Sequence, residues 1–302
     1  MNWKQICLIT SCLIVGMANT TLAQGNGSAV HPVRVIYDYE TTMPEEMFFT
    51  PYEACLFALA DMDKGKHYAD VERLLAWYFP RVNKLDKYGV SGTVYDFTLT
   101  GNKEKVVDTY DSVDGYSGVF LYLLNEYYKA TGDSKIILAN WSKINDIAYT
   151  IPFLQQKDGL TIAYTEYPEE YLMDNCEAYG GIRAYLELAK ALKQKIDYKY
   201  YAAVANSIKN GIYGYLPMGN TLAWSKSGTY RNKSNWNTFY PDAYAQIFPV
   251  FYNLGTLQDR IYVWQLFVEK YPETIWHTFP IEQRLFCELT KAKLVREGYK
   301  NE

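Results

Sequence analysis

Asp111-Ser112-Val113-Asp114-Gly115-Tyr116-Ser117 is the stretch that decides the fold, because it opens an amphipathic helix and its pattern recurs along the chain. The apolar residues that follow keep the i, i+3, i+4 spacing of a single helix face: Val119, Phe120, Leu123, Leu124 and Tyr127. This spacing predicts a helix that begins near the stretch and packs on one side.

Similar helix starts recur at three other places: Pro51-Tyr52-Glu53-Ala54-Cys55, Asp174-Asn175-Cys176-Glu177-Ala178-Tyr179-Gly180 and Tyr240-Pro241-Asp242-Ala243-Tyr244-Ala245. The acids that precede Ala or Gly are Glu53, Asp114, Glu177 and Asp242, at separations of 61, 63 and 65 residues. Glu282 starts a fifth helix after a shorter interval. Each period has room for one helix, an antiparallel second helix and a loop back, so the chain is predicted to repeat an αα-hairpin.

Further apolar periodicity predicts helices around residues 137–151, 201–212, 261–268 and 281–292, whereas residues 93–99, 160–164 and 221–224 are strand-like. We therefore expect an all-α fold of four hairpins and one inner helix, with small β-hairpins in the loops. A repeat period near 63 and long aromatic loops favour a closed ring over an open solenoid. Residues 41–302 are predicted to form this one domain, after an N-terminal arm over residues 24–40.

Residues 1–23 have the pattern of a secretory signal peptide. Lys4 supplies the positive charge, Ile6 to Met17 the apolar core, and Thr21-Leu22-Ala23 the small residues before a cleavage site at Gln24. The apolar core is too short for a transmembrane helix, and no later stretch approaches the roughly 18 apolar residues of a membrane span. We expect a periplasmic or secreted protein. A lipoprotein cleaved before Cys12 is the alternative.

Composition narrows the class of partner. The 302 residues hold 30 Lys and Arg against 34 Asp and Glu, a net charge of −4 without a basic cluster, which argues against nucleic acid and anionic membranes. Three scattered histidines without metal-ligand spacing predict neither a metal nor a cofactor. The cysteines at 55, 176 and 287 lie in apolar helical pattern and are expected to be buried free thiols. The 30 Tyr and 7 Trp suit either sugar stacking or core packing.

At these helix starts the sequence resembles the six-hairpin glycosidase superfamily, the (α/α)6 toroids. Three segments carry the resemblance, which spans about residues 45–295: residues 111–133, 171–181 and 240–246. The chain has fewer helices than the twelve of a full toroid. The resemblance implies parallel inner helices whose starts share one rim, and a glycoside hydrolase that cleaves an oligo- or polysaccharide, mostly with inversion.

Glycoside hydrolysis needs one protonated carboxyl group and one carboxylate, which the resemblance places on this rim. We expect Glu177 to be the general acid, because its apolar neighbours would raise its pKa, and Asp114 to be the hydrated base beside Gly115 and Ser117. The residues expected to bind substrate are Asp111, Asp174, Asp242, Glu53, Tyr116, Tyr179, Tyr244, Trp224 and Trp236.

Each of these residues could instead have a purely structural role. Acids at a helix start are favoured as caps, and the pairs Asp111/Asp114 and Asp174/Glu177 have capping-box spacing in outline. Tyrosines and tryptophans serve equally as core residues. For the whole chain, a non-catalytic glycan-binding or scaffold protein is the main alternative to a hydrolase, and a sugar epimerase or polysaccharide lyase is a third.

The signal pattern makes the first prediction: the mature protein begins at Gln24. N-terminal sequencing or the intact mass of the exported protein checks it. A mature chain that begins at Cys12 and carries a lipid adduct would contradict it.

Overall fold

The structure is a computed structural model that describes residues 30–38, 44–65 and 67–300. The predicted signal peptide, residues 1–23, lies outside the described residues. Within the predicted N-terminal arm, the described part forms helix α2 (Pro32–Asp38), which packs against α3 (Pro51–Asp63) and α4 (Tyr68–Tyr78).

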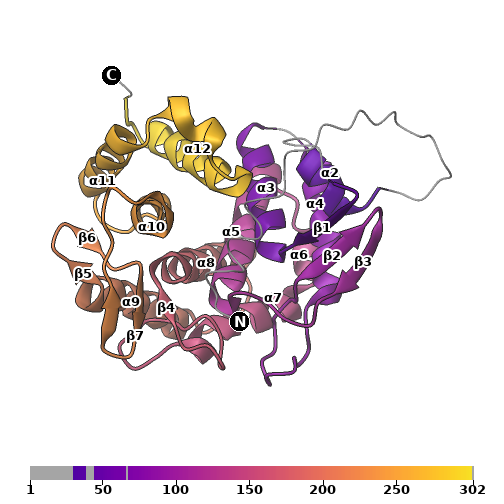
Figure 1. The fold of residues 1–302 in the computed structure, drawn as a ribbon. Coiled ribbons are helices and arrows are strands. Elements are labelled where there is room, and N and C mark those ends of the chain that lie inside the picture. The colour runs from indigo at the N-terminus through magenta and orange to yellow at the C-terminus, as the bar shows by residue number, and fades with distance from the viewer. Residues whose placement is uncertain (1–29, 39–43, 66, 301–302) are drawn as a thin grey trace.

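Five helices form an inner ring: α3, α5 (Val113–Thr131), α8 (Leu172–Ala191), α10 (Tyr244–Phe251) and α12 (Ile281–Arg296). Each packs against the next, and α12 packs back against α3, so the ring is closed (Figure 1). The predicted all-α toroid is therefore confirmed, and its reduced ring closes on itself rather than remaining an open arc.

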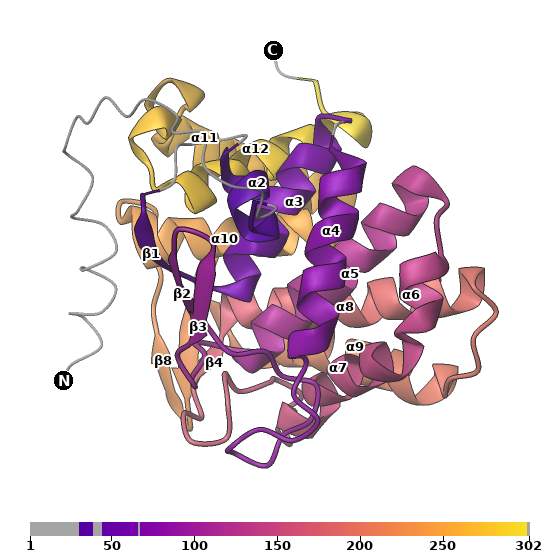
Figure 2. The same cartoon turned by 90° about the vertical axis from the view of Figure 1, so that its right-hand side faces the viewer.

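Four outer helices cover this ring: α4, α7 (Trp141–Leu154), α9 (Tyr198–Tyr215) and α11 (Leu257–Lys270), which pack on α3, α5, α8 and α10 respectively (Figure 2). Over the described ranges, this gives the four hairpins and one inner helix that the repeat predicts. Shorter helical segments connect them: α6 (Lys135–Ala139), the 3₁₀ segments η2 (Phe79–Arg81) and η4 (Glu273–Thr278), and the π-helical η3 (Phe239–Ala243). No helix in the described part of the chain combines the length and hydropathy needed to cross a bilayer.

Three small antiparallel sheets lie in the loops, as expected. Their strands are β1 (Glu46–Phe49), β2 (Phe97–Thr100) and β3 (Lys103–Val106); β4 (Glu170–Tyr171), β7 (Ser225–Ser227) and β8 (Tyr230–Asn232); and β5 (Pro217–Met218) with β6 (Thr221–Leu222). The predicted strand at residues 160–164 is wrong. That segment makes only the single bridges Gln155–Thr161 and Tyr164–Tyr167, because its other backbone groups bond to neighbouring loops.

The inner helices run parallel, which puts their first turns at one end of the ring. At the opposite end Arg296 of α12 forms an ion pair with Asp63 of α3, and Asn125 of α5 donates to Glu187 of α8 over 3.0 Å. The acids at the helix starts therefore share one end, and the last turns of the helices share the other.

Aromatic and aliphatic side chains fill the space between inner and outer helices. Tyr78 of α4 stacks on Phe120 of α5 with ring centroids 3.7 Å apart, and Phe248 of α10 stacks on Phe286 of α12 at 4.1 Å. The free thiols of the core are buried as predicted: Cys55, Cys176 and Cys287.

Helices α5 and α8 approach each other more closely than side chains would allow. A Cβ atom on Gly118 would lie 2.4 Å from the carbonyl carbon of Glu177, and one on Gly181 would lie 2.5 Å from the Cα of Gly118. Only glycine fits at these positions, since real Cβ atoms do not approach other backbone atoms so closely.

We expect Gly118→Ala to lower the free energy of unfolding by about 1–3 kcal/mol, because the new methyl group overlaps the α8 backbone. Gly214→Ala in α9 is the matched control: nothing lies within 4 Å of its Cβ position, so alanine should add about 0.5–1 kcal/mol through helix propensity. Urea unfolding of the two variants checks this. Equal stabilisation by both would show that the helix contact is looser than described.

Candidate active site

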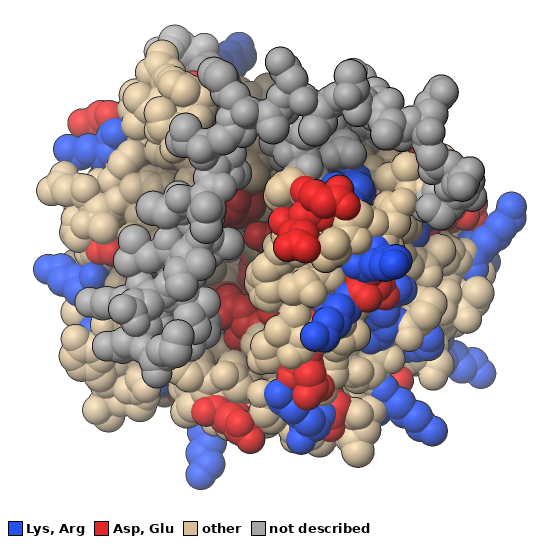
Figure 3. Space-filling model, turned by 45° about the vertical axis from the view of Figure 1, so that its right-hand side comes forward, with Lys and Arg blue, Asp and Glu red and all other residues tan. Residues whose placement is uncertain are grey.

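Four carboxyl groups from two adjacent inner helices meet at the end of the ring where those helices begin. Asp111 and Asp114 flank the start of α5, and Asp174 and Glu177 lie in the first two turns of α8. A Cβ atom on Gly115 would lie 2.7 Å from Oε2 of Glu177 and 3.5 Å from Oδ1 of Asp174. We call these four residues the acid cluster. Acidic side chains also lie in a hollow near the middle of the face in Figure 3.

Capping does not explain the acid cluster. The N-cap of α5 is Ser112, so Asp111 lies one residue outside the helix, and the N-cap of α8 is Tyr171, whose side chain caps nothing. Glu177 is six residues into α8, well beyond the capping positions. The capping-box alternative for the Asp111/Asp114 and Asp174/Glu177 pairs is therefore wrong.

Ser112 links the two helices through its hydroxyl group. Its Oγ lies 2.8 Å from Oδ1 of Asp114 and 2.7 Å from Oδ2 of Asp174. One hydroxyl has a single proton and cannot donate to two carboxylates, so one carboxyl group must supply a proton itself. Burial, and then the charge of Asp114, hold the pKa of Asp174 well above its usual range. The proton therefore lies on Asp174, which donates to Ser112, and Ser112 donates to Asp114.

Asp114 is fully buried, at 0 % exposure, which corrects the expectation that it is hydrated. Its carboxylate also accepts from the Gly115 amide at 3.0 Å and from the Thr161 hydroxyl at 2.5 Å. Burial raises its pKa to about 6, and these donors oppose the rise. The sequence misled here because Gly115 and Ser117 pack against other chain segments rather than leaving the acid open to water.

Glu177 sits in the kind of environment that the sequence predicts, at 2 % exposure. Burial, followed by the nearby carboxyl group of Asp174, raises the pKa of Glu177 well above its usual range and favours the protonated form. Its Oε1 atom has no hydrogen-bond partner among the described residues. A buried polar atom without a partner is uncommon and marks a position that a ligand or water would satisfy.

Asp111 is the exposed member of the acid cluster. Protein nonetheless surrounds it closely enough that lost hydration, together with the charge of Asp114, raises its pKa to about 6. Asp174 is half-buried beside it. These two residues are the members of the cluster that reach solvent.

The other two aligned acids, which the sequence predicts to bind substrate, form hydrogen bonds with residues outside the acid cluster. Glu53 accepts from the Thr50 amide at 2.9 Å in a capping box and from the Tyr37 hydroxyl at 3.3 Å. Asp242 accepts from the amide and the side chain of Asn235, at 2.9 and 2.8 Å. Glu53 is thus hydrogen-bonded to α2 and to the residue before α3, and Asp242 is hydrogen-bonded to the loop before η3.

The three tyrosines predicted to bind substrate are not surface residues of this site. Tyr116 is 6 % exposed and donates to Asp96 over 2.9 Å, and Tyr244 is 4 % exposed in the core. Tyr179 lines a cavity at the opposite end of the ring. Tyr116 still contacts the acid cluster from within the protein, because its hydroxyl accepts from the Asp111 amide at 3.4 Å.

Trp224 lies beside the site, whereas Trp236 packs partly buried against the core and leaves its indole N–H without a described partner. The indole of Trp224 begins a run of neighbouring aromatic rings with centroids 5.6–6.5 Å apart, which we call the aromatic arc: Trp224, Tyr171, Tyr167, Tyr164 and Tyr110. It joins the start of α8 to the start of α5. The tyrosines of this arc were not singled out from the sequence, although Tyr164, Tyr167 and Tyr171 stand close together in one loop.

The sequence also does not predict two other polar residues near the site. Asn175 accepts from the Thr161 amide at 2.7 Å and donates to the Thr161 carbonyl at 3.0 Å, which holds this loop over Asp114. Asp96 is 3 % exposed and its pKa is raised to about 8 by burial. Nothing in the local sequence around Asp96 indicates that it lies near α5.

No group of three His, Cys, Asp or Glu side chains in the described ranges is arranged to hold a metal ion.

The raised pKa values predict a protein that is more stable at pH 5 than at pH 8. Burial raises the pKa of Asp96 to about 8, of Glu53 to about 7 and of Asp111 to about 6, against roughly 4 in the unfolded chain. The folded state thus holds more protons between pH 4 and 8, so stability falls as pH rises. His31 and Lys293, whose pKa values are lowered by burial, oppose the trend.

Melting temperatures between pH 5 and 8 check this prediction. Asp96→Asn should flatten the profile, since asparagine still accepts from Tyr116 but cannot ionise. Glu269→Gln, at an exposed position of α11, should leave the slope unchanged. A melting temperature that rises toward pH 8 would contradict the prediction.

Comparison with solved structures places the fold. The rhamnosidase from Klebsiella oxytoca with rhamnose bound aligns at a TM-score of 0.52 and 16 % identity, over 83 % of this chain and 48 % of that one. The chain thus spans about half the length of that rhamnosidase. Two weaker likenesses are cellobiose 2-epimerase from Bacillus thermoamylovorans B4167 (TM-score 0.49, 9 % identity, 84 % and 73 % covered) and glycosyl hydrolase family 88 from Bacteroides vulgatus (0.41, 10 %, 80 % and 74 %).

No protein-family model matches the sequence, and no curated protein matches it. At these identities the likeness concerns the fold alone. The chain has the αα-hairpin toroid fold seen in the rhamnosidase, which confirms the fold that the resemblance to six-hairpin glycosidases implies.

Proposed function

We propose that this protein hydrolyses glycosidic bonds in an oligo- or polysaccharide by carboxylate acid–base catalysis. The observation that carries the proposal is the acid cluster, in which protonated and ionisable carboxyl groups from two helices meet beside exposed aromatic rings. A rhamnosidase of the same fold, solved with rhamnose bound, supports a carbohydrate as the substrate class. Burial and like charge keep the pKa values of the cluster apart, which assigns acid and base.

Asp174 is the proposed general acid in place of Glu177. Burial raises its pKa well above the usual range, which favours the protonated form, and it is half-buried, so a substrate oxygen can reach it. Glu177 also has a raised pKa but is only 2 % exposed, so a substrate oxygen has less access to it. Asp114 and Ser112 position Asp174 through their hydrogen bonds rather than touching substrate.

Asp111 is the proposed general base. With a pKa of about 6 it is ionised at neutral pH, and it is exposed to water. In the reaction Asp174 gives its proton to the glycosidic oxygen as the bond from that oxygen to the anomeric carbon breaks. Asp111 takes a proton from the water whose oxygen attacks that carbon. Exchange with solvent then restores both groups. Direct attack by water implies inversion at the anomeric carbon.

The aromatic arc supplies the proposed sugar contacts. Tyr164, Tyr167, Tyr171 and Trp224 are each partly exposed, and flat aromatic faces suit the apolar faces of sugar rings. Burial raises the pKa of Tyr164, and the nearby charge of Asp111 adds to the shift, which supports a position of this ring close to the base. We further propose that the protein acts after export, on the strength of its signal-peptide pattern.

A non-catalytic glycan-binding protein is the second candidate, favoured by the burial of Asp114 and Glu177. Product analysis over a panel of oligosaccharides separates the two functions. Release of reducing ends supports a hydrolase, and the anomer first seen by NMR reports inversion or retention. Saturable binding without product would support the binding protein.

The role of the acids can be tested by substitution. Asp111→Asn and Asp174→Asn should each lower kcat by about 10²–10⁴-fold, because each removes one partner of the proton transfer. Asp242→Asn is the matched control: it is aligned in the repeat but bonds to Asn235 outside the acid cluster, and it should keep its activity. All three should melt within a few degrees of the wild type. Wild-type turnover in the first two variants would refute the assignment.

A further inference from the structure

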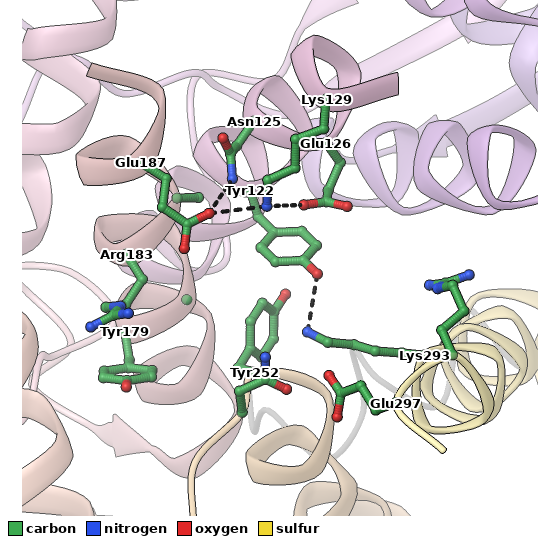
Figure 4. A pocket seen from close by; sticks show the side chains of 14 residues that line it. Tyr122, Asn125, Glu126, Lys129, Tyr179, Arg183, Glu187, Tyr252, Lys293 and Glu297 are labelled. Carbon is green, nitrogen blue, oxygen red and sulfur yellow. Dashed lines mark hydrogen bonds and ion pairs between the residues drawn. The ribbon is translucent and has the colours of Figure 1, made fainter. Parts of the chain in front are cut away.

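A second cavity lies at the opposite end of the ring from the acid cluster. It has a volume of about 310 Å³ and is lined by the middle and C-terminal parts of α5 and α8, the end of α12 and the turn that follows α10 (Figure 4). Its walls are mainly polar and include the side chains of Tyr122, Asn125, Tyr179, Tyr252 and Asn253. This volume is at the lower end of the range of small-molecule sites, which suits a ligand of about one sugar ring.

Most charges around the cavity neutralise one another. Lys129 lies 3.0 Å from both Glu126 and Glu187, Glu297 pairs with Arg260 at 2.6 Å, and Arg296 pairs with Asp63. Together these groups carry one net negative charge, because Lys129 faces two glutamates.

Two cations of the cavity wall form no ion pair with a described carboxylate. Lys293 of α12 donates to the Tyr122 hydroxyl at 3.2 Å and to the Phe251 carbonyl, which are both neutral groups. Arg183 of α8 is exposed on the wall across from it (Figure 4). Burial lowers the pKa of Lys293 to about 8, which still leaves the side chain mostly protonated at pH 7. The nearby charges of Glu297 and Glu126 oppose this fall in pKa, but neither carboxylate forms an ion pair with Lys293 among the described residues.

We propose that this cavity binds a small hydroxylated anion, such as a sugar acid or a sugar phosphate, with its anionic group on Lys293. Tyrosine rings and asparagine amides on the remaining walls would contact the hydroxylated ring. Arg183 adds positive potential from the opposite wall. The site is distinct from the acid cluster, which lies at the other end of the ring and contains no cation among its four members.

Calorimetric titration of the full protein at pH 7 and low salt tests the proposal with three probes: D-glucuronate, glucose 6-phosphate and D-glucose. We expect at least one anionic probe to bind about tenfold or more tightly than glucose, since a hydrogen bond to a charged group is worth about that factor or more. Binding of glucuronate alone identifies a carboxylate site, and binding of the phosphate alone identifies a phosphate-ester site. If neither anion binds better than glucose, the proposal is wrong.

Variants locate the bound anion. Lys293→Met should weaken binding by about tenfold or more, and Arg183→Gln, at an exposed position that does not threaten folding, should weaken it several-fold at low salt. Lys291→Met is the matched control on the same helix, because Lys291 pairs with Glu273 outside the cavity. Asp174→Asn should bind the anion like the wild type. Unchanged binding in both Lys293→Met and Arg183→Gln, or an equal loss in Lys291→Met, would overturn the assignment.

Discussion

The close contact of α5 and α8 is the constraint on which the rest of the structure depends. Gly118 and Gly181 bring the two backbones to a separation at which no side chain fits between them. This contact fixes the register of the two helices along their axes. The first turn of α5 also contains Gly115, which has no side chain. A Cβ atom at that position would occupy the space beside Glu177, so the glycine lets the carboxyl groups of the two helices lie close together.

Crowding of these carboxyl groups then determines their chemistry. Burial and neighbouring acids raise the pKa values of all four carboxyl groups, so the four do not all ionise together at neutral pH. The hydrogen bonds of Ser112 agree with this, because its hydroxyl group can bond to both Asp114 and Asp174 only if one of the two carboxyl groups is protonated. The arrangement costs stability at neutral pH, as sites that store strained or buried charges commonly do.

The parallel ring also separates charge between its two ends. Helix starts carry partial positive charge and helix ends partial negative charge, so acids are favoured at one end and cations at the other. The acid cluster follows this rule, and so do Lys129, Lys293 and Arg296 near the last turns. Lys293 differs from a surface cation because it is half-buried and bonds to the carbonyl of Phe251 at the end of α10. One architecture thus provides two polar sites of opposite character.

The sequence by itself determined the helices, their hairpin order and the repeat of acids at helix starts, because apolar periodicity and turn chemistry are local properties. It also indicated a raised pKa for Glu177 from the apolar residues around it. Only the tertiary structure decided which acids meet. Glu53 accepts a hydrogen bond from Thr50, and Asp242 accepts one from Asn235. Asp114 is covered by the buried loop that contains Thr161. Tyr179 faces the far cavity because each helical residue advances about 100° around the axis, and the identity of the partner on each face is set by chain segments distant in sequence.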